Sequence, residues 1–309
     1  MSPSSSGIAK PHASTIPADG LIALLILYAL WGSTFLAIKF ALGSFPPFLL
    51  GGTRFPIAGA LMFGYLLLRR TAMPTRRQWL HCTIYGFLLI GLGNGLLALA
   101  EQYVSSGLAA ALSGASPLVI ALLSGALGKW PRKLEWLGII IGLSGLIIIN
   151  SGDEMRSNLP GLLALIASTL TWALGSVLAR EKLDLPGGTM TTAIELFTGG
   201  LLQLTISLVL GERMLPLTAA GLGGWLYLLA ASIIGFTSYT IVLRRLRPVL
   251  ATSFSYVNPV VAILLGIVLG GESISRVAAI GVAVTLVGVI FITLAQAKWL
   301  SQASAPEPE

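Results

Sequence analysis

Long apolar runs separated by short polar segments make up most of this chain. Taken in order, the runs predict ten membrane-spanning helices at residues 20–42, 48–68, 79–100, 104–127, 135–150, 159–179, 189–210, 222–242, 250–269 and 277–297. A helix needs about 20 apolar residues to cross about 30 Å of hydrocarbon, and most of the runs have that length. The pattern therefore predicts an all-α polytopic membrane protein. Residues 1–19 are expected to form a disordered cytoplasmic tail, and residues 298–309 a second tail on the same side.

Composition supports this class of protein and excludes several others. Hydrophobic residues make up 55% of the 309 positions and charged residues only 10%, whereas soluble domains have about 25% charged residues. The net charge of +7 comes from Lys and Arg in short segments between the runs, so nucleic acid is not an expected partner. A single cysteine, Cys82, excludes a disulfide framework and a multi-cysteine metal site. No metal and no cofactor is expected.

The distribution of Lys and Arg predicts the orientation in the membrane. With the N-terminus placed in the cytoplasm, fourteen of the nineteen Lys and Arg residues fall on the cytoplasmic side and three on the outer side. The positive-inside rule then places both termini in the cytoplasm. The remaining two, Lys39 and Arg54, lie within spans. Lys39 is close to the outer end of the first span, so its side chain is expected to snorkel to the membrane surface.

Two of the apolar runs carry a proline at matching positions. The fourth contains Ser113-Gly114-Ala115-Ser116-Pro117 and the ninth contains Ser255-Tyr256-Val257-Asn258-Pro259, 142 residues later. A proline inside a helix removes one N–H group and disrupts the bond to the carbonyl four residues back. Within a membrane, freed backbone is tolerated only inside protein or beside a water-filled cavity. The two segments therefore predict a substrate site near the middle of the membrane.

The two halves of the chain, residues 20–150 and 159–297, are predicted to be repeats of five helices each. Other matching residues recur at an offset of 141, among them Trp31 with Trp172 and Arg54 with Glu195. Because each half has an odd number of spans, the second half enters the membrane from the opposite side. The predicted architecture is a five-plus-five inverted repeat.

Several short motifs point to a known family. They are Trp31-Gly32-Ser33-Thr34-Phe35, Ser116-Pro117-Leu118, Lys133-Leu134-Glu135-Trp136-Leu137-Gly138, Asn258-Pro259-Val260-Val261-Ala262 and Leu269-Gly270-Gly271-Glu272. In these motifs the chain resembles the drug/metabolite transporter superfamily, specifically its bacterial EamA-type exporters, over nearly its whole length. The resemblance implies a carrier of the inner membrane that works by alternating access. It also implies that the fifth and tenth helices are peripheral and that the other eight line the cavity.

Four charged residues are candidates for gating or coupling. Arg54 and Glu195 each lie about 9 Å into a span, and a charge at that depth marks a functional site by default. The two residues enter from opposite sides of the membrane, which argues against a bond between them. The predicted ion pairs are instead Arg54 with Glu101 and Glu195 with Arg244. They are gates in one interpretation and static locks between helices in the other, and Glu195 is also the candidate carrier of a coupling proton.

Polar and aromatic residues in the middle of spans are candidates for substrate binding. The indoles of Trp31 and Trp172 lie far from the membrane surfaces where Trp is usual, so they form cavity walls or ordinary helix contacts. Tyr256 offers a hydroxyl next to a freed carbonyl, and the amide of Asn94 either holds helices together or binds a ligand. The predicted binding set is Trp31, Ser33, Asn94, Ser113, Ser116, Trp172, Tyr239, Tyr256 and Asn258.

These features predict a secondary transporter and not an enzyme. The expected activity is export of small amphipathic metabolites, amino acids or drugs across the bacterial inner membrane, with protons as the candidate coupling ion. A polytopic enzyme is one alternative, but the spans contain no repeated acidic motif, no His/Glu zinc set and no Ser–His pair. A channel is another, and it usually needs a selectivity filter or a ring of like charges.

Overall fold

The computed structural model of the chain describes residues 17–128, 130–151, 158–246 and 253–303. Within these ranges every regular element is helical, which confirms the all-α prediction for this part of the chain. The elements are α1 (Ala18–Leu42), α2 (Pro47–Leu68), α3 (Arg76–Gly86), η1 (Phe87–Asn94), α4 (Gly95–Ala100), α5 (Ser106–Ser113), α6 (Ser116–Ala126), α7 (Lys133–Ser151), α9 (Leu159–Glu181), α10 (Gly188–Leu210), α11 (Ala219–Arg245), α13 (Phe254–Val268) and α14 (Arg276–Ala303).

Each predicted span overlaps a helical stretch, but two of the stretches are not single α-helices. The span predicted at 79–100 consists of α3, η1 and α4, and the span predicted at 104–127 is divided into α5 and α6. Six helical stretches among the described residues are long and apolar enough to cross a membrane. They are Ala18–Leu42, Arg76–Ala100, Ser106–Ala126, Leu159–Glu181, Gly188–Leu210 and Ala219–Val242.

The element η1 is a π-helix, in which each N–H bonds to the carbonyl five residues back. Two carbonyl groups in this stretch accept side-chain hydrogen bonds from other helices. Gln203 Nε2 donates to the Ile90 carbonyl at 2.5 Å, and Ser168 Oγ donates to the Gly93 carbonyl at 2.6 Å. The third predicted span is therefore fastened to α9 and α10 at the point where its helical register changes.

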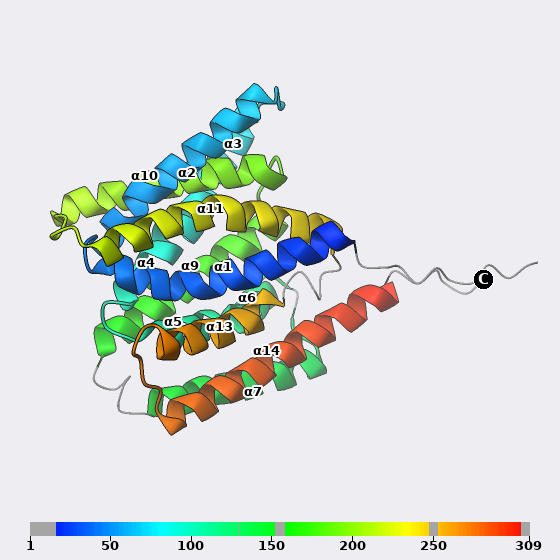
Figure 1. Cartoon of the computed structure of the whole chain (residues 1–309). Helices are drawn as coiled ribbons and strands as arrows, with labels where there is room; N and C mark the ends of the chain where they lie inside the picture. Colours follow the sequence, from blue (N-terminus) through cyan, green and yellow to red (C-terminus); the bar gives the residue numbers. More distant parts are fainter. Residues whose placement is uncertain (1–16, 129, 152–157, 247–252, 304–309) are drawn as a thin grey trace, which may run out of the picture.

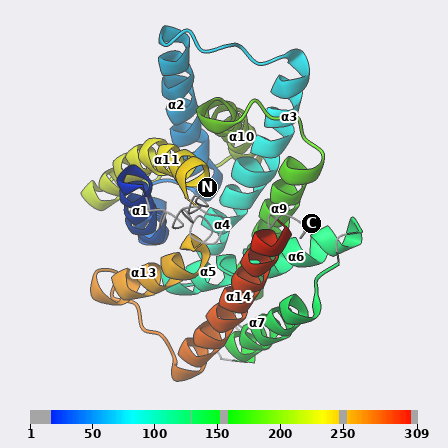
Figure 2. The same ribbon diagram turned by 90° about the vertical axis from the view of Figure 1, so that its right-hand side faces the viewer.

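The helices pack in pairs that are distant in sequence. The closest associations join α7 with α14, α2 with α10, and α1 with α11. The first pair lies along one edge of the molecule, at the bottom of Figure 1, and Figure 2 again places it at one side of the bundle. Glycine makes this contact close, because the backbone of Gly288 lies directly against that of Gly142.

The ends of the helices define two faces of the molecule. Figure 1 shows α1 beginning and α14 ending at the same right-hand end, which we call the terminal face. There Arg245 Nε pairs with Asp19 Oδ2 at 2.9 Å, joining the end of α11 to the start of α1. At the opposite face Lys39 Nζ pairs with Glu272 Oε1 at 2.8 Å, joining the end of α1 to the linker after α13.

Candidate functional site

A cavity of about 380 Å³ lies in the middle of the helix bundle. Every described helix except α7 and α14 contributes to its lining, as expected if those two helices are peripheral. The volume is within the range of about 300–1,000 Å³ found for small-molecule sites. Most of the lining is apolar, and hydroxyl groups and a few charged or amide groups are distributed through it.

The cavity reaches the surface at the terminal face. Arg180, near the end of α9, is the one exposed residue among the described residues of the lining. On α13 the lining residues belong to the first half of the helix, from Phe254 to Pro259, which is the half nearer the terminal face. For the described residues, the lining is thus exposed at the terminal face and buried toward the opposite face.

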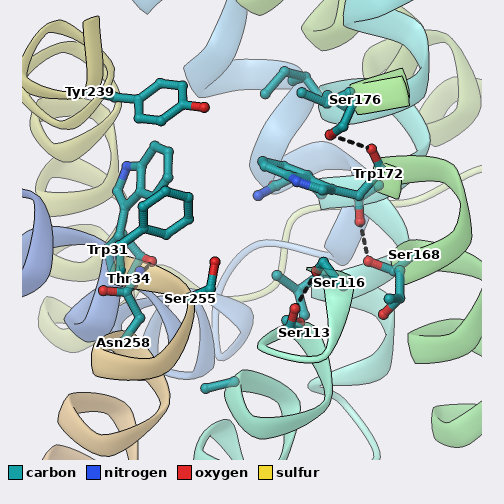
Figure 3. A pocket seen from close by; sticks show the side chains of 18 of the residues that line it. Trp31, Thr34, Ser113, Ser116, Ser168, Trp172, Ser176, Tyr239, Ser255 and Asn258 are labelled. Atoms are coloured by element: carbon teal, nitrogen blue, oxygen red, sulfur yellow. Dashed lines mark hydrogen bonds between the residues drawn. The ribbon is translucent and has the colours of Figure 1, made fainter. Parts of the chain in front are cut away.

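An aromatic cluster forms one wall of the cavity. The ring of Trp31 contacts Phe236, Tyr239 and Phe254, with centroid distances of 5.4, 5.2 and 5.1 Å. Trp31 packs closely against α11 because residue 235 is glycine, where a Cβ would lie 2.7 Å from the indole Nε1. Figure 3 shows Trp172 on the other side of the cavity, facing this cluster. The two predicted tryptophans therefore lie on opposite walls of one site.

The two proline-containing segments meet at the cavity. Ser113, Ser116, Ser255 and Asn258 all line it, and Figure 3 shows them near one another. The contact between the segments is made at Gly114, where a Cβ would lie 2.8 Å from Pro259 Cγ and 2.9 Å from the Ser255 carbonyl oxygen. Only glycine leaves room for this approach. The two segments from which a substrate site was predicted are therefore in contact with each other.

The polar groups of these segments differ in their bonding. The Ser116 hydroxyl donates to the Ser113 carbonyl in its own turn. Asn258 is 7% exposed, and its Oδ1 atom has no hydrogen-bond partner among the described residues. A buried amide oxygen without a partner costs free energy, so Asn258 is the stronger candidate for contact with a bound molecule.

The predicted pair of Arg54 and Glu101 is not formed. Arg54 Nη2 donates to Asn94 Oδ1 at 3.1 Å, and its guanidinium lies 4.1 Å from the centroid of the Phe55 ring. Neither carboxylate oxygen of Glu101 has a hydrogen-bond partner among the described residues. Glu101 follows Asn94 by seven residues, so it lies about 10 Å further along the helix. The Arg54 guanidinium lies at the level of Asn94 and bonds to it instead of to Glu101. Arg54 lines the cavity and Glu101 does not.

The predicted pair of Glu195 and Arg244 is not formed either. Glu195 is buried in the cavity wall, and its Oε2 atom has no partner among the described residues. Arg244 is exposed at the end of α11, where its guanidinium lies against Gly188. Gly188 begins α10, and Glu195 lies seven residues deeper, about 10 Å along the axis. The two charges are thus at different depths.

Three other predicted residues have different outcomes. Ser33 does not line the cavity; its hydroxyl bonds to the Ala29 carbonyl at 2.6 Å and to the Tyr227 hydroxyl at 2.5 Å. The side chain of Tyr256 lies outside the described residues. Lys39 does not line the cavity; its side chain is 37% exposed at the end of α1, and its ammonium group pairs with Glu272, so snorkelling to the membrane surface stays a prediction.

Sequence reasoning missed a row of polar residues on α9. Ser168, Ser176 and Arg180 line the cavity together with Trp172, each four residues from the next. That spacing places the four side chains on one face of a helix. The signal was available as regularly spaced polar positions in an otherwise apolar run. Tyr85 and Ser232 also line the cavity, and no comparable pattern marked them.

The arrangement suits the binding of an organic molecule. Among the described residues, no group of three or more His, Cys, Asp or Glu side chains lies close enough to hold a metal ion. The cavity instead offers aromatic surfaces, hydroxyl groups, the carboxylate of Glu195 and the guanidinium groups of Arg54 and Arg180. It can therefore accommodate an amphipathic small molecule.

Known proteins resemble this chain over most of its length. The pattern of the EamA-like transporter family matches it twice, at residues 19–151 and 159–294. An "Uncharacterized inner membrane transporter YedA" of Escherichia coli is 40% identical over 277 residues, covering 88% of this chain and 90% of YedA. "Protein PecM" of Dickeya dadantii is 28% identical over 266 residues, covering 85% of this chain and 86% of PecM.

A solved structure supports the fold. A protein described only as "Crystal structure of protein" aligns with a TM-score of 0.64 at 24% identity, over 92% of this chain and 100% of its own. At that identity the likeness concerns the fold alone. The two family matches and the identity to YedA extend over both halves of the sequence. This chain therefore belongs to the EamA-like transporter family.

Proposed function

We propose that this protein is a secondary transporter that exports small amphipathic metabolites, amino acids or drugs across the bacterial inner membrane by alternating access. The observation that carries the proposal is a cavity of substrate size, lined by helices from both halves, whose one exposed lining residue in the described part of the chain, Arg180, lies at the terminal face. A transporter in one access state has such a cavity, whereas a conducting channel has openings at both faces.

The proposed architecture is ten spans in a five-plus-five inverted repeat, with both termini in the cytoplasm. The two family matches support the repeat. The offset between matching residues also supports it, since it changes from 141 at Arg54, in α2, to 142 at Ser113, in α5. The linker at 69–75 has its counterpart at 211–218, which is one residue longer. The excess of Lys and Arg on the terminal face supports the orientation.

The proposed substrate site is the cavity between the aromatic cluster and Trp172, with Asn258 as its main polar contact. Trp31, Asn94, Ser113, Ser116 and Tyr239 complete the predicted set that lines it. Glu195 is the proposed carrier of a coupling proton, because it is a buried cavity carboxylate whose Oε2 atom has no partner among the described residues. A gating role for Arg54 with Glu101, or for Glu195 with Arg244, would require each pair to form in another conformation.

The test is transport by the purified protein in liposomes with an imposed pH gradient. A panel of amino acids, amphipathic amines and neutral aromatic metabolites is offered, and flux is compared with that of protein-free liposomes. We expect saturable flux of at least one amphipathic compound, with a dependence on the gradient that disappears in Glu195→Gln. Failure of every class in correctly reconstituted protein would contradict the transporter proposal. Gradient-dependent flux in Glu195→Gln would contradict only the role of that residue.

A further inference from the structure

The carboxylate of Glu272 fastens three helices together at the opposite face. Its Oε1 atom accepts from Lys39 Nζ at 2.8 Å and from the Ser106 backbone N–H at 3.0 Å. Its Oε2 atom accepts from the Ser106 hydroxyl at 3.0 Å and from the Gly107 N–H at 3.3 Å. Lys39 ends α1, Ser106 begins α5, and Glu272 belongs to the linker after α13. We call this set the Glu272 clasp.

The local backbone is shaped to place this carboxylate. Gly271 has φ of +62°, a conformation that glycine adopts without strain, and it turns the chain back after α13. Gly266, in the last turn of α13, leaves space that the Glu272 carboxylate occupies. The carboxylate also lies at the N-terminus of α5, where the helix dipole favours negative charge. The side chain of Glu272 is only 7% exposed.

At neutral pH the clasp depends on the negative charge of the Glu272 carboxylate. Burial alone would raise the pKa of Glu272, but hydrogen bonds from Lys39, Ser106 and Gly107 lower this pKa below its ordinary value. The carboxylate therefore stays ionised and keeps its ion pair with Lys39.

The clasp lies at the closed end of the cavity. The lining of α1 ends at Ile38, the residue before Lys39. The lining of α5 ends one turn after Ser106, at Ala110, and the lining of α13 stops at Pro259, two turns before the end of that helix. All three helices thus contribute to the cavity wall and meet at the clasp. Separation of these three ends would therefore open the wall of the cavity toward the opposite face.

We propose that the Glu272 clasp is the gate of the opposite face, closed in this conformation and broken once in each transport cycle. This inference rests on the proposed function, because a gate has meaning only in a protein with two access states. The ion pair with Lys39 holds the gate shut, and the bonds to Ser106 and Gly107 fix the carboxylate in place for that pair.

A second acidic residue at the same face provides a matched control. Glu212 accepts from the backbone N–H groups of Phe48 and Leu49, at 3.3 and 2.8 Å, and so caps α2. Helices α2 and α10 are already packed backbone to backbone along their length, since a Cβ at Gly52 would lie 2.6 Å from the Leu204 amide nitrogen. Loss of the Glu212 carboxylate is therefore expected to weaken a cap without opening the cavity.

The experiment measures access to the end of the cavity from each face. In a Cys82→Ala background, Ile38→Cys is reacted with a membrane-impermeant maleimide in right-side-out and inside-out membrane vesicles. With the wild-type clasp, we expect reaction only from the terminal face. Glu272→Gln is expected to raise the reaction rate from the opposite face about fivefold, the effect of weakening the closed state by one partly exposed ion pair. Glu212→Gln is expected to leave that rate unchanged.

Two further variants separate gating from misfolding. Lys39→Gln removes the ion pair but retains the bonds at the start of α5, and it is expected to open the same face. The exchange Lys39→Glu with Glu272→Lys restores the pair but loses the bonds to the α5 N-terminus, so partial reclosure is expected. Equal rates for wild type, Glu272→Gln and Lys39→Gln would overturn the gate. Because labelling requires no substrate, this result is independent of whether the liposome assay detects transport.

Discussion

The two proline-containing segments have related sequences but different structures. In the first half the helix ends at Ser113 and a new one begins at Ser116, so Pro117 lies in the first turn of α6. In the second half α13 continues from Phe254 to Val268 with Pro259 inside it. The first segment places glycine before its serine and proline, at position 114, where the chain breaks most easily. The second has no glycine between its serine and its proline.

This difference determines which polar groups are available to a bound molecule. The break in the first segment is stabilised locally, because the Ser116 hydroxyl bonds to the Ser113 carbonyl. The second segment leaves the Asn258 amide oxygen buried without a partner among the described residues. The equivalent positions 116 and 258 can therefore have different roles: Ser116 stabilises the backbone break, and Asn258 is available to bind a ligand. The predictions below test that division.

The largest effect is expected at the contact between the segments. Gly114→Ala places a methyl group 2.8 Å from Pro259 Cγ and 2.9 Å from the Ser255 carbonyl oxygen. Overpacking of this kind costs about 1–3 kcal/mol, so we expect a lower unfolding temperature in detergent and loss of transport. Gly223→Ala is the control, since a Cβ there meets no atom within 4 Å. Equal stability of the two variants would mean that the segments are not in tight contact.

The next effect concerns recognition by the second segment. Asn258→Ala is expected to weaken substrate binding about tenfold, because one buried hydrogen bond is lost. The unfolding temperature should change little, since Oδ1 has no partner among the described residues. The measurement is the KM for flux in liposomes. An unchanged KM would show that the amide does not contact the substrate.

Replacing each proline should change stability in opposite directions. Pro259→Ala can restore an N–H bond inside α13 and is expected to stabilise the protein by about 1 kcal/mol. Pro117→Ala restores no such bond, because proline is well placed in a first helical turn. It instead increases the freedom of the unfolded chain and is expected to destabilise by about 0.5 kcal/mol. Chemical denaturation in detergent would distinguish these signs, and changes of the same sign would imply equivalent helices.

The smallest effect is expected from the serine hydroxyl of the first segment. Ser116→Ala removes one local bond and is expected to cost about 0.5–1 kcal/mol of stability without altering the KM. Ser116→Thr retains the hydroxyl and serves as the control. If Ser116→Ala raised the KM as much as Asn258→Ala, both segments would contact the substrate and the proposed division would fail.

Much of the helix order and part of the cavity could be predicted from the sequence. Apolar runs determine where helices form, and their polar positions give an approximate depth. This depth was sufficient to predict Trp31, Trp172 and Asn258 as residues of one site, and all three line the cavity. It does not specify how far each helix is rotated about its axis. The partner of Arg54 depends on that rotation, which is why Asn94, although predicted to be a site residue, was not predicted to bond to Arg54.

The Glu272 clasp shows a second limit of prediction. The sequence places Lys39 near the end of a span, where snorkelling to the surface is the simplest expectation. Its actual partner lies 233 residues away, in a linker whose turn depends on the positive φ of Gly271. Such a contact depends on three helix ends converging. No local pattern of apolar and polar residues encodes that convergence.

Substitutions outside the π-helix η1 can affect its conformation, because residues of other helices bond to its backbone. Its carbonyl groups at Ile90 and Gly93 are engaged by Gln203 and Ser168, which belong to other helices. The choice between π and α register in the third span is therefore made partly by residues outside it. A substitution at Gln203 or Ser168 can change the secondary structure of a segment more than 70 positions away in the chain. Alterations of this span thus need to be designed together with its neighbours.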